Sequence, residues 1–468
     1  MRWRRATCLA LLVTASAAAQ APNNPFTAPI QPTEGVVRVR FRTFASIPDM
    51  GGQAARMMLL VDEPGTKRLF VNDMRGPLYT VSYDGAAVRQ YVDINAAQWG
   101  VAVQATGRER GFQSFAMHPQ FGQPGTPGFG KFYTWTDSSN TAPQPDFQPG
   151  GGNNTHDTVL LEWTAKNPAA AAYDGGAPRE LLRLEQPFPN HNGGHISFHP
   201  SARPGSAEYS LLYVGIADGG SGGDPLNLAQ NLASPFGKII RIDPLGSNSP
   251  NKKYGIPKQN PFAGRAGVLG EIYVYGVRNP QRFGWDPRNN NLFVADIGQN
   301  IVEELSPAPA GANLGWNKWE GSFGYVSRQA INLARRRADP SATYPVVEYD
   351  HMDPLLLRGD AAITGVHVYR TGEIPQLANL VLFSDFPSGE IFSVTADKLP
   401  AGGQDAIRRV LLNDAGNTKT FLQVIREANM KQGKAPTTRA DLRFGTGPNG
   451  QVFLLNKHDG TIRLLIPD

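Results

Sequence analysis

Three histidines stand close together in one short stretch of the sequence, FPNHNGGHISFHP, at residues 188–200. The chain has eight histidines in all, so His191, His195 and His199 form a marked concentration. Imidazole ionises near neutral pH and binds metals, so the stretch is a candidate for acid–base chemistry or for a zinc site. A helix would align a spacing of four, but the glycine pair and the flanking prolines oppose a helix. In an extended chain the outer histidines lie about 26 Å apart at roughly 3.3 Å per residue, so we do not expect a shared metal ion.

The surrounding pattern gives the histidines different expected roles. His199 precedes a proline at the end of an apolar run, and His118 does the same in SFAMHP, so both are expected at a structural strand-to-turn position. His195 opens the strand and is compatible with either a structural or a chemical role. His191 precedes the glycine pair in an expected loop, between two asparagines that could orient its ring. His191 is therefore the candidate for chemistry.

A repeated pattern indicates the elements that must position this loop. The repeat consists of a short alternating strand that ends at a proline or turn, a second apolar strand, a glycine or acidic turn, and a third strand. A lone meander leaves its edge strands unpaired. Such units are therefore expected to pack side by side around a central axis and close into a ring. The sequence therefore predicts an all-β, six-bladed β-propeller, with two packed β-sandwich domains as the alternative. The units span residues 57–81, 114–137, 195–220, 283–305, 365–394 and 442–465, and one short helix is expected at 419–430.

The amino-terminal residues have the three-part pattern of a secretory signal. A basic start precedes an apolar run at Leu9–Val13 and then small residues, which predicts a signal peptide at 1–19. A pair of arginines in the basic start is also compatible with twin-arginine export. We expect an extension at 20–35, a propeller domain at 36–468, and a periplasmic or secreted protein.

Composition narrows the possible partners and chemistry. The chain has 45 lysines and arginines and 40 acids, and loss of the signal's three arginines would lower the formal charge from +5 to +2. This balance gives no reason to expect a nucleic-acid partner. The single cysteine, Cys8, lies in the expected signal, so disulfides and thiolate chemistry are not expected. Beyond the signal, no apolar run approaches the roughly 18 residues of a membrane span.

Several motifs in order resemble a known family. NHNGGHISFHP, LLYVGIADGGSGGDPLNLAQN, GKIIRIDP, EIYVYGVRNPQRFGWDP and ADIGQNIVEEL are similar to the soluble quinoprotein glucose/sorbosone dehydrogenases. The resemblance runs from about residue 56 to the carboxyl terminus and is most specific between 188 and 320. It implies a six-bladed propeller that uses pyrroloquinoline quinone and Ca²⁺. It also implies an oxidoreductase that transfers hydride from an aldose sugar or polyol to the quinone and passes the electrons to an external acceptor.

The resemblance also implies roles for individual residues. His191 matches the general base that takes the proton of the sugar hydroxyl, a task that suits imidazole. The VRNP motif would place Arg278 and Asn279 over the quinone, where they can stabilise negative charge on its oxygens. The segment that matches the calcium loop points to the main-chain carbonyls of Gly298 and Gln299, and calcium prefers such oxygen ligands.

This chain departs from the family pattern at three positions. Glu109 stands where the glucose-oxidising members carry a glutamine that contacts the quinone. The DFPSG segment lacks the lysine that the family carries in this loop. Arg439 and Arg443 replace a closely spaced arginine pair, in a shifted register, and with Glu109 they are the remaining candidates for contact with the quinone. Because the quinone is a tricarboxylate, a loss of matched cations would weaken its binding.

Two other functions are compatible with these departures. The first is a non-catalytic propeller of the same family that binds a ligand or a partner protein, which the missing cations favour. The second is a calcium-dependent lactone hydrolase, which shares the architecture but not the ordered motifs. The presence of His191, Arg278 and Asn279 together favours the dehydrogenase, since a fold alone does not define a function.

Overall fold

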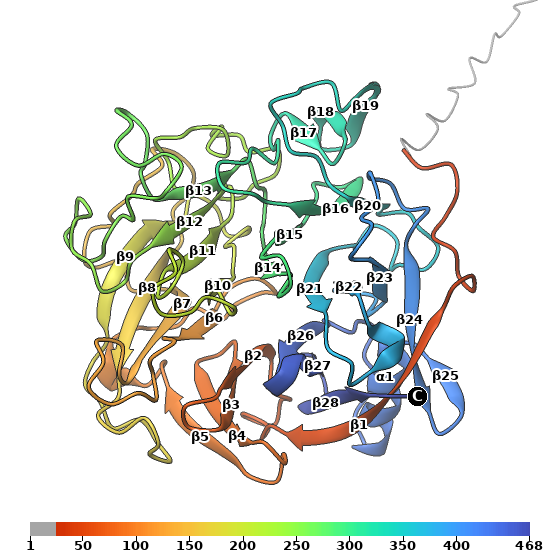
Figure 1. Ribbon diagram of the computed structural model, residues 1–468, viewed down its shortest axis with the longest axis horizontal. Helices are drawn as coiled ribbons and strands as arrows, with labels where there is room; N and C mark the ends of the chain where they lie inside the picture. The colour runs from red at the N-terminus through yellow and green to blue at the C-terminus, as the bar shows by residue number, and fades with distance from the viewer. Residues whose placement is uncertain (1–24) are drawn as a thin grey trace, which may run out of the picture.

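The computed structural model describes residues 25–468, and its fold is almost entirely β (Figure 1). The predicted signal peptide, Cys8 and the first part of the predicted extension lie outside the described residues. Figure 1 shows the sheets arranged around a common centre, with their inner strands toward the middle of the view. This arrangement is consistent with a β-propeller.

Four antiparallel meanders follow one another through the first three quarters of the chain. The first is β2 (Met57–Glu63), β3 (Arg68–Asp73), β4 (Pro77–Ser82) and β5 (Val88–Asp93). The second is β6 (Phe112–Met117), β7 (Lys131–Ser138), β8 (Asp157–Thr164) and β9 (Arg179–Glu185). The third is β10 (Ile196–Phe198), β11 (Leu212–Ile216), β12 (Lys238–Ile242) and β13 (Ile272–Tyr275). The fourth is β14 (Arg282–Trp285), β15 (Leu292–Asp296), β16 (Val302–Pro307) and β20 (Val347–Asp350).

The remaining strands join the two ends of the chain. One group is β21 (Ile363–Tyr369), β22 (Leu380–Asp385), β23 (Ile391–Thr395) and β24 (Arg408–Asp414), with β25 (Asn417–Lys419) paired to β24. The other is β26 (Arg443–Thr446), β27 (Val452–Leu455) and β28 (Thr461–Ile466), completed by β1 (Val37–Ser46). Strand β1 pairs antiparallel with β28 and parallel with β24, so the amino-terminal strand closes the carboxyl-terminal group.

The predicted repeat ranges all contain strands, but their extents differ from the prediction. Each group has a fourth strand that the three-strand pattern did not include. In the second and third groups the third strand, β8 or β12, lies beyond the predicted range, because a long loop precedes it. A small sheet of β17 (Trp319–Glu320), β18 (Phe323–Ser327) and β19 (Ala330–Arg336) was also not predicted. The expected helix at 419–430 is confirmed as α1 (Phe421–Lys431). Three single-turn 3-10 segments, at Ala97–Trp99, Pro375–Leu377 and Pro448–Gly450, complete the described elements.

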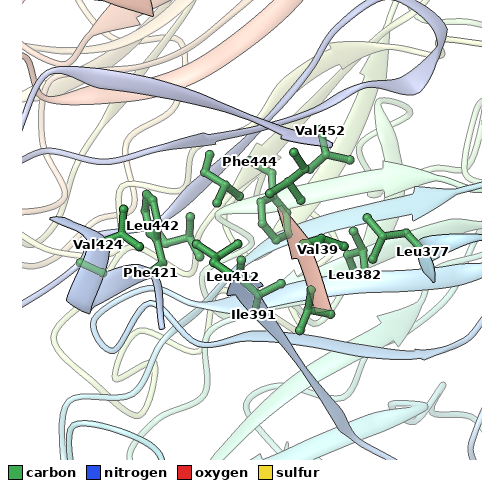
Figure 2. Close-up of a cluster of buried hydrophobic side chains, with 14 of the residues drawn as sticks. Val39, Leu377, Leu382, Ile391, Leu412, Phe421, Val424, Leu442, Phe444 and Val452 are labelled. Atoms are coloured by element: carbon green, nitrogen blue, oxygen red, sulfur yellow. The ribbon is translucent and has the colours of Figure 1, made fainter. Parts of the chain in front are cut away.

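Apolar side chains from neighbouring sheets pack face to face and hold the groups together. Figure 2 shows one such cluster, which includes Val39 of β1, Leu382 of β22, Phe444 of β26 and Phe421 of helix α1. Full burial of one such side chain stabilises the fold by about 1.5–3 kcal/mol. The helix starts at Thr420, whose side chain and that of Gln423 form a reciprocal capping box.

Within residues 25–468, no helix has the length and apolar character that a membrane crossing needs.

Candidate functional site

The loop between β9 and β10 holds His191 in an unusual backbone conformation. His191 has a φ of +56°, in the left-handed region that L residues rarely adopt, and its side chain is buried. Gly193 also has a positive φ, of +70°, and a Cβ at this position would lie 2.8 Å from the main chain of β11 at Gly215 and of Ala217. The glycine therefore lets the loop lie directly against the neighbouring strand. Left-handed residues of this kind occur at sites where the surrounding structure fixes them.

A buried carboxylate orients the His191 imidazole. Asp218, just beyond β11, places Oδ1 2.7 Å from Nδ1 of His191, and its Oδ2 accepts a hydrogen bond from Nε1 of Trp316 at 2.8 Å. Burial would raise the pKa of Asp218, but the hydrogen bond from His191 and the nearby guanidinium of Arg278 hold the pKa of that carboxyl below its usual range. The ionised carboxylate favours the tautomer with a proton on Nδ1, so Nε2 is left able to accept one.

Arg278 faces the other nitrogen of His191. Its Nη2 donates toward Nε2 of His191 at 2.9 Å, and its Nη1 donates to the carbonyl of Ile297 at 2.8 Å. The Nε and Nη2 atoms each lie 3.3 Å from Oε1 of Gln299, and the guanidinium lies 5.5 Å from the centre of the Trp316 ring. Arg278 is thus a fixed cation at the base candidate, well placed to stabilise negative charge that develops there.

Glu109 joins the same group from a distant part of the chain. Its Oε2 accepts a hydrogen bond from the main-chain nitrogen of His191 at 2.8 Å, and the amide of Asn279 lies 3.5 Å from the same oxygen. The main-chain nitrogens of Arg278 and Asn279 donate to the buried carboxylate of Asp296, at 2.8 and 2.7 Å. These contacts fix the VRNP loop relative to the histidine loop.

Arg443 is a deeply buried cation with free donor capacity. Its Nη2 donates to Oε1 of Gln281 at 3.1 Å, and the amide nitrogen of Gln281 donates to the carbonyl of Gly193 at 2.8 Å. Among the described residues, Nε and Nη1 of Arg443 have no hydrogen-bond partner, although the side chain is only 3% exposed. Burial lowers the pKa of Arg443 to about 9, against the raising effects of Asp441 and Glu109. Buried donors without an acceptor fit the carboxylate or quinone oxygens of the implied cofactor.

The loop that lacks the family's lysine carries an aromatic ring instead. Phe386, in DFPSG, lies under the guanidinium of Arg443, which is 4.2 Å from its ring centre. Arg439 and Lys457 lie 5.7 and 5.0 Å from the same ring. Cations over an aromatic face are attracted by its quadrupole. The ring therefore gathers three basic side chains from the last part of the chain.

The structure thus separates the predicted site residues into two neighbouring sets. One set lies at the histidine loop and consists of His191, Arg278, Asn279, Glu109 and Gln299, with Arg443 joined to it through Gln281. Arg439 is not in direct contact with that set. Its guanidinium pairs with Asp360 and, at 3.1 Å, with Asp441, and it lines an adjoining cavity of about 510 Å³.

The predicted calcium loop has main-chain oxygens that suit the ion. Neither carbonyl of Gly298 or Gln299 accepts a hydrogen bond from another described residue. A Cβ at Gly298 would lie 1.7 Å from the carbonyl of Val302, so the tight loop requires glycine. The Gln299 side-chain oxygen is already used by Arg278 and by the nitrogen of Gly223. In the described part of the chain no three His, Cys, Asp or Glu side chains could hold a metal together, so a calcium ion here would depend on carbonyls.

The other clustered histidines have structural surroundings. Nδ1 of His199 accepts a hydrogen bond from the nitrogen of Ser201 at 3.2 Å, and Nδ1 of His118 accepts one from Gln120 at 3.1 Å. Their predicted strand-to-turn role is confirmed. His195 is buried against the Phe283 ring, 4.6 Å between centres, and burial lowers its pKa well below the usual value.

Sequence reasoning missed four residues that build the site: Asp218, Gln281, Trp316 and Lys457. Asp218 carried a usable signal, because it is the acid that ends an apolar strand just before a glycine pair. Gln281 follows the VRNP motif closely. Trp316 and Lys457 come from remote loops and had no local signal.

Comparison with known proteins identifies the family of the chain. The family model described as glucose/sorbosone dehydrogenase matches residues 56–427, and the chain belongs to this family. The HIPL1 protein of Arabidopsis thaliana is 28% identical over 394 residues, which cover 77% of this chain and 53% of that protein. The aldose sugar dehydrogenase YliI of Escherichia coli is 25% identical over 268 residues, which cover 57% of each. The chain thus spans about half the length of the curated relatives it matches.

Solved structures share the fold. A PQQ-bound aldose sugar dehydrogenase from Streptomyces coelicolor superposes with a TM-score of 0.57 at 20% identity, covering 94% of this chain and 99% of that one. The apo form of the soluble aldose sugar dehydrogenase from Escherichia coli gives a TM-score of 0.59 at 16% identity, covering 92% and 99%. At these identities the likeness shows a shared fold.

Proposed function

We propose that this protein is an exported dehydrogenase that oxidises a hydroxyl of an aldose sugar or polyol, with pyrroloquinoline quinone as the hydride acceptor. The observation that carries the proposal is the buried His191 imidazole, which has Asp218 at Nδ1 and Arg278 at Nε2. A carboxylate behind an imidazole and a cation in front of it form a general base beside a site for negative charge.

Three side chains would act in the proton transfer from the substrate hydroxyl. A substrate hydroxyl takes the place of the Arg278 N–H at Nε2 of His191, and Nε2 receives the hydroxyl proton. Asp218 stabilises the resulting imidazolium through its hydrogen bond at Nδ1. Arg278, held by Gln299 and by the carbonyl of Ile297, stays beside the reacting centre and stabilises negative charge there.

The quinone, when bound, supplies the two-electron acceptor that no side chain of the protein can provide. Arg443 and Asn279 are the residues that would hold it, and the unpartnered donors of Arg443 support this assignment. A calcium ion on the carbonyls of Gly298 and Gln299 would offset the negative charge that Glu109 brings to the site. An external acceptor would then remove the electrons.

The proposal includes the organisation of the chain. A signal peptide at 1–19 and an extension at 20–35 would precede one six-bladed propeller at 36–468, in the periplasm or outside the cell. The pairing of β1, which starts at Val37, with both β28 and β24 supports a domain that begins near residue 36. Six groups of four strands, the last completed by β1, support the number of blades.

One reconstitution experiment tests the proposed function. The purified protein is mixed with Ca²⁺ and pyrroloquinoline quinone, and the quinone absorbance and dye reduction are followed with a panel of aldoses and polyols. We expect a shifted quinone spectrum and dye reduction with at least one sugar. Absence of any quinone binding would overturn the proposal and would favour a propeller that only binds a ligand or partner.

A further inference from the structure

The cavity of about 510 Å³ beside the Phe386 ring is lined mainly by basic side chains. Its lining includes five cations, Arg56, Arg108, Lys434, Arg439 and Lys457, and the single acid Asp441. The cations come from three separate parts of the chain, and the pairings of β1 with β28 and of β2 with β26 bring the first and last of these parts together.

Three of these cations already have a carboxylate partner. Nζ of Lys434 lies 2.9 Å from Asp49, and Arg108 lies 3.6 Å from Asp360. Arg439 pairs with Asp360 and with Asp441. In these ion pairs the carboxylates neutralise the cations, so these three cations have little need of a further anion.

The side chains of the other two lining cations, and of Arg443 behind them, donate hydrogen bonds only to neutral oxygens. Nζ of Lys457 donates to the carbonyl of Arg108 at 2.9 Å, and its side chain is 7% exposed. Arg56 donates to the carbonyls of Ala105 and Gly107. Burial lowers the pKa of Lys457 well below its usual value, despite the nearby Asp441. A buried cation without a counterion is costly, and a bound carboxylate would remove that cost.

One turn connects this cavity with the His191 site. The carbonyl of Arg108 accepts the hydrogen bond from Lys457, and the next residue, Glu109, accepts the one from the main chain of His191. Consecutive Cα atoms are about 3.8 Å apart, so the cavity and the imidazole flank the same short turn. The cavity and the histidine loop thus share the Arg108–Glu109 segment, and a ligand that extends past this segment from His191 would present an anionic group to the cavity.

We infer that this cavity is a carboxylate-binding site, in which Lys457 and Arg56, together with Arg443, hold a carboxylate of the ligand. The DFPSG segment itself has no lysine. Lys457 comes from a different loop and places its ammonium group over the ring of Phe386 in that segment. The carboxylate has two possible sources: the quinone itself, or a sugar acid as substrate. Only the quinone source rests on the proposed function.

Equilibrium binding to the full chain, measured by calorimetry in the presence of Ca²⁺, tests the inference without any need for turnover. The probes are pyrroloquinoline quinone against its trimethyl ester, and galacturonate against galactose. We expect at least one carboxylate probe to bind more tightly than its neutral counterpart. Lys457→Met and Arg56→Met should each weaken that probe about 10- to 100-fold, as the loss of a charge-assisted hydrogen bond does. Lys457→Arg should restore most of the affinity.

Lys434→Met is the matched control, because Lys434 lines the same cavity but is paired with Asp49. We expect it to change the affinity by less than about twofold. Melting curves report whether each variant is folded, and the comparison of probes on the unmutated protein does not depend on any variant.

The outcomes separate the two sources and the two proposals. Weakened binding of the quinone assigns the carboxylate to the cofactor, and weakened binding of galacturonate alone assigns it to a sugar acid. If the quinone does not bind but galacturonate depends on Lys457, the carboxylate site stands and the proposed function fails. If neither acid binds better than its neutral counterpart, or if Lys457→Met and Arg56→Met leave both affinities unchanged in folded protein, the inference is overturned.

Discussion

The carboxylate of Asp218 lies 2.7 Å from Nδ1 of His191, and both side chains are buried. The same carboxylate accepts a hydrogen bond from Trp316, so its orientation is fixed from two sides. This hydrogen bond gives the histidine loop a role beyond connecting β9 and β10. It selects one tautomer of the imidazole and leaves Nε2 as the proton acceptor.

Replacement of Asp218 should therefore reduce turnover while leaving the fold intact. Asp218→Asn keeps the shape but removes the charge that stabilises the imidazolium, so we expect kcat to fall about 100- to 10,000-fold. Steady-state kinetics of the reconstituted enzyme measure this fall, with quinone binding as the control. A variant that retains more than half of the kcat of the unmutated enzyme would show that Asp218 does not act through the histidine.

The positive φ of Gly193 predicts a second, structural effect. Gly193→Ala would place a Cβ 2.8 Å from the main chain of β11 in a left-handed conformation, which alone costs roughly 1–2 kcal/mol. We expect a lower melting temperature and lost activity. Gly176→Ala is the control, because a Cβ there meets nothing within 4 Å. Equal melting temperatures for the two variants would mean that the histidine loop is not held tightly against the strand.

The strands could be predicted from sequence because alternation and turn residues are local signals. The pairing between distant strands that completes the sheets could not be predicted from such local signals. Val37 of β1 pairs with Val410 of β24, and no local pattern reports a partner so far along the chain. The strands β8 and β12 were placed incorrectly for a related reason, because long loops separate them from the strands that they join.

The candidate site was predictable only in part. His191 and Arg278 stand in ordered motifs, and the structure brings them within 2.9 Å. Trp316 and Lys457 reach the site by folding alone. Sequence also does not show which of the two shifted arginines reaches the site. Arg443 lies at the site, whereas Arg439, four residues earlier, lines the neighbouring cavity. Sequence register alone does not distinguish these two positions.

Calcium should stabilise the protein if it binds at Gly298 and Gln299. A ligand that binds only the native state raises stability by mass action. We expect the melting temperature to fall when a chelator is added and to recover with excess Ca²⁺, but not with Mg²⁺, which demands tighter octahedral geometry. A chelator that leaves the melting temperature unchanged, with no metal found by elemental analysis, would rule out the carbonyl site.

Asp137 should give the stability a distinct dependence on pH. It lies near His156, which contacts Asn192 beside the catalytic candidate. Burial raises the pKa of Asp137 to about 7, opposed by hydrogen bonds from Thr158 and Gly111 and by further donors. Because the folded pKa exceeds the unfolded value of about 3.9, the folded state binds the proton more tightly. The contribution of Asp137 to stability is therefore full below about pH 4 and declines as pH rises toward about 7.

Asp137→Asn removes this titration. Chemical unfolding at a series of pH values should show a flatter pH dependence for the variant than for the unmutated protein between about pH 4 and pH 7. Parallel curves across that window would mean that Asp137 is ionised in the folded state and that the surrounding donors outweigh its burial.

The central claim is that His191 is the general base, and a comparison of two histidines tests it most directly. His191→Ala and His199→Ala each remove one imidazole from the same thirteen-residue stretch. In protein reconstituted with the quinone and Ca²⁺, we measure kcat with the best sugar together with the quinone absorbance. We expect His191→Ala to lower kcat about 100- to 10,000-fold with the absorbance retained, and His199→Ala to lose little activity. Small and equal losses in both variants would contradict it and would make the histidine cluster structural.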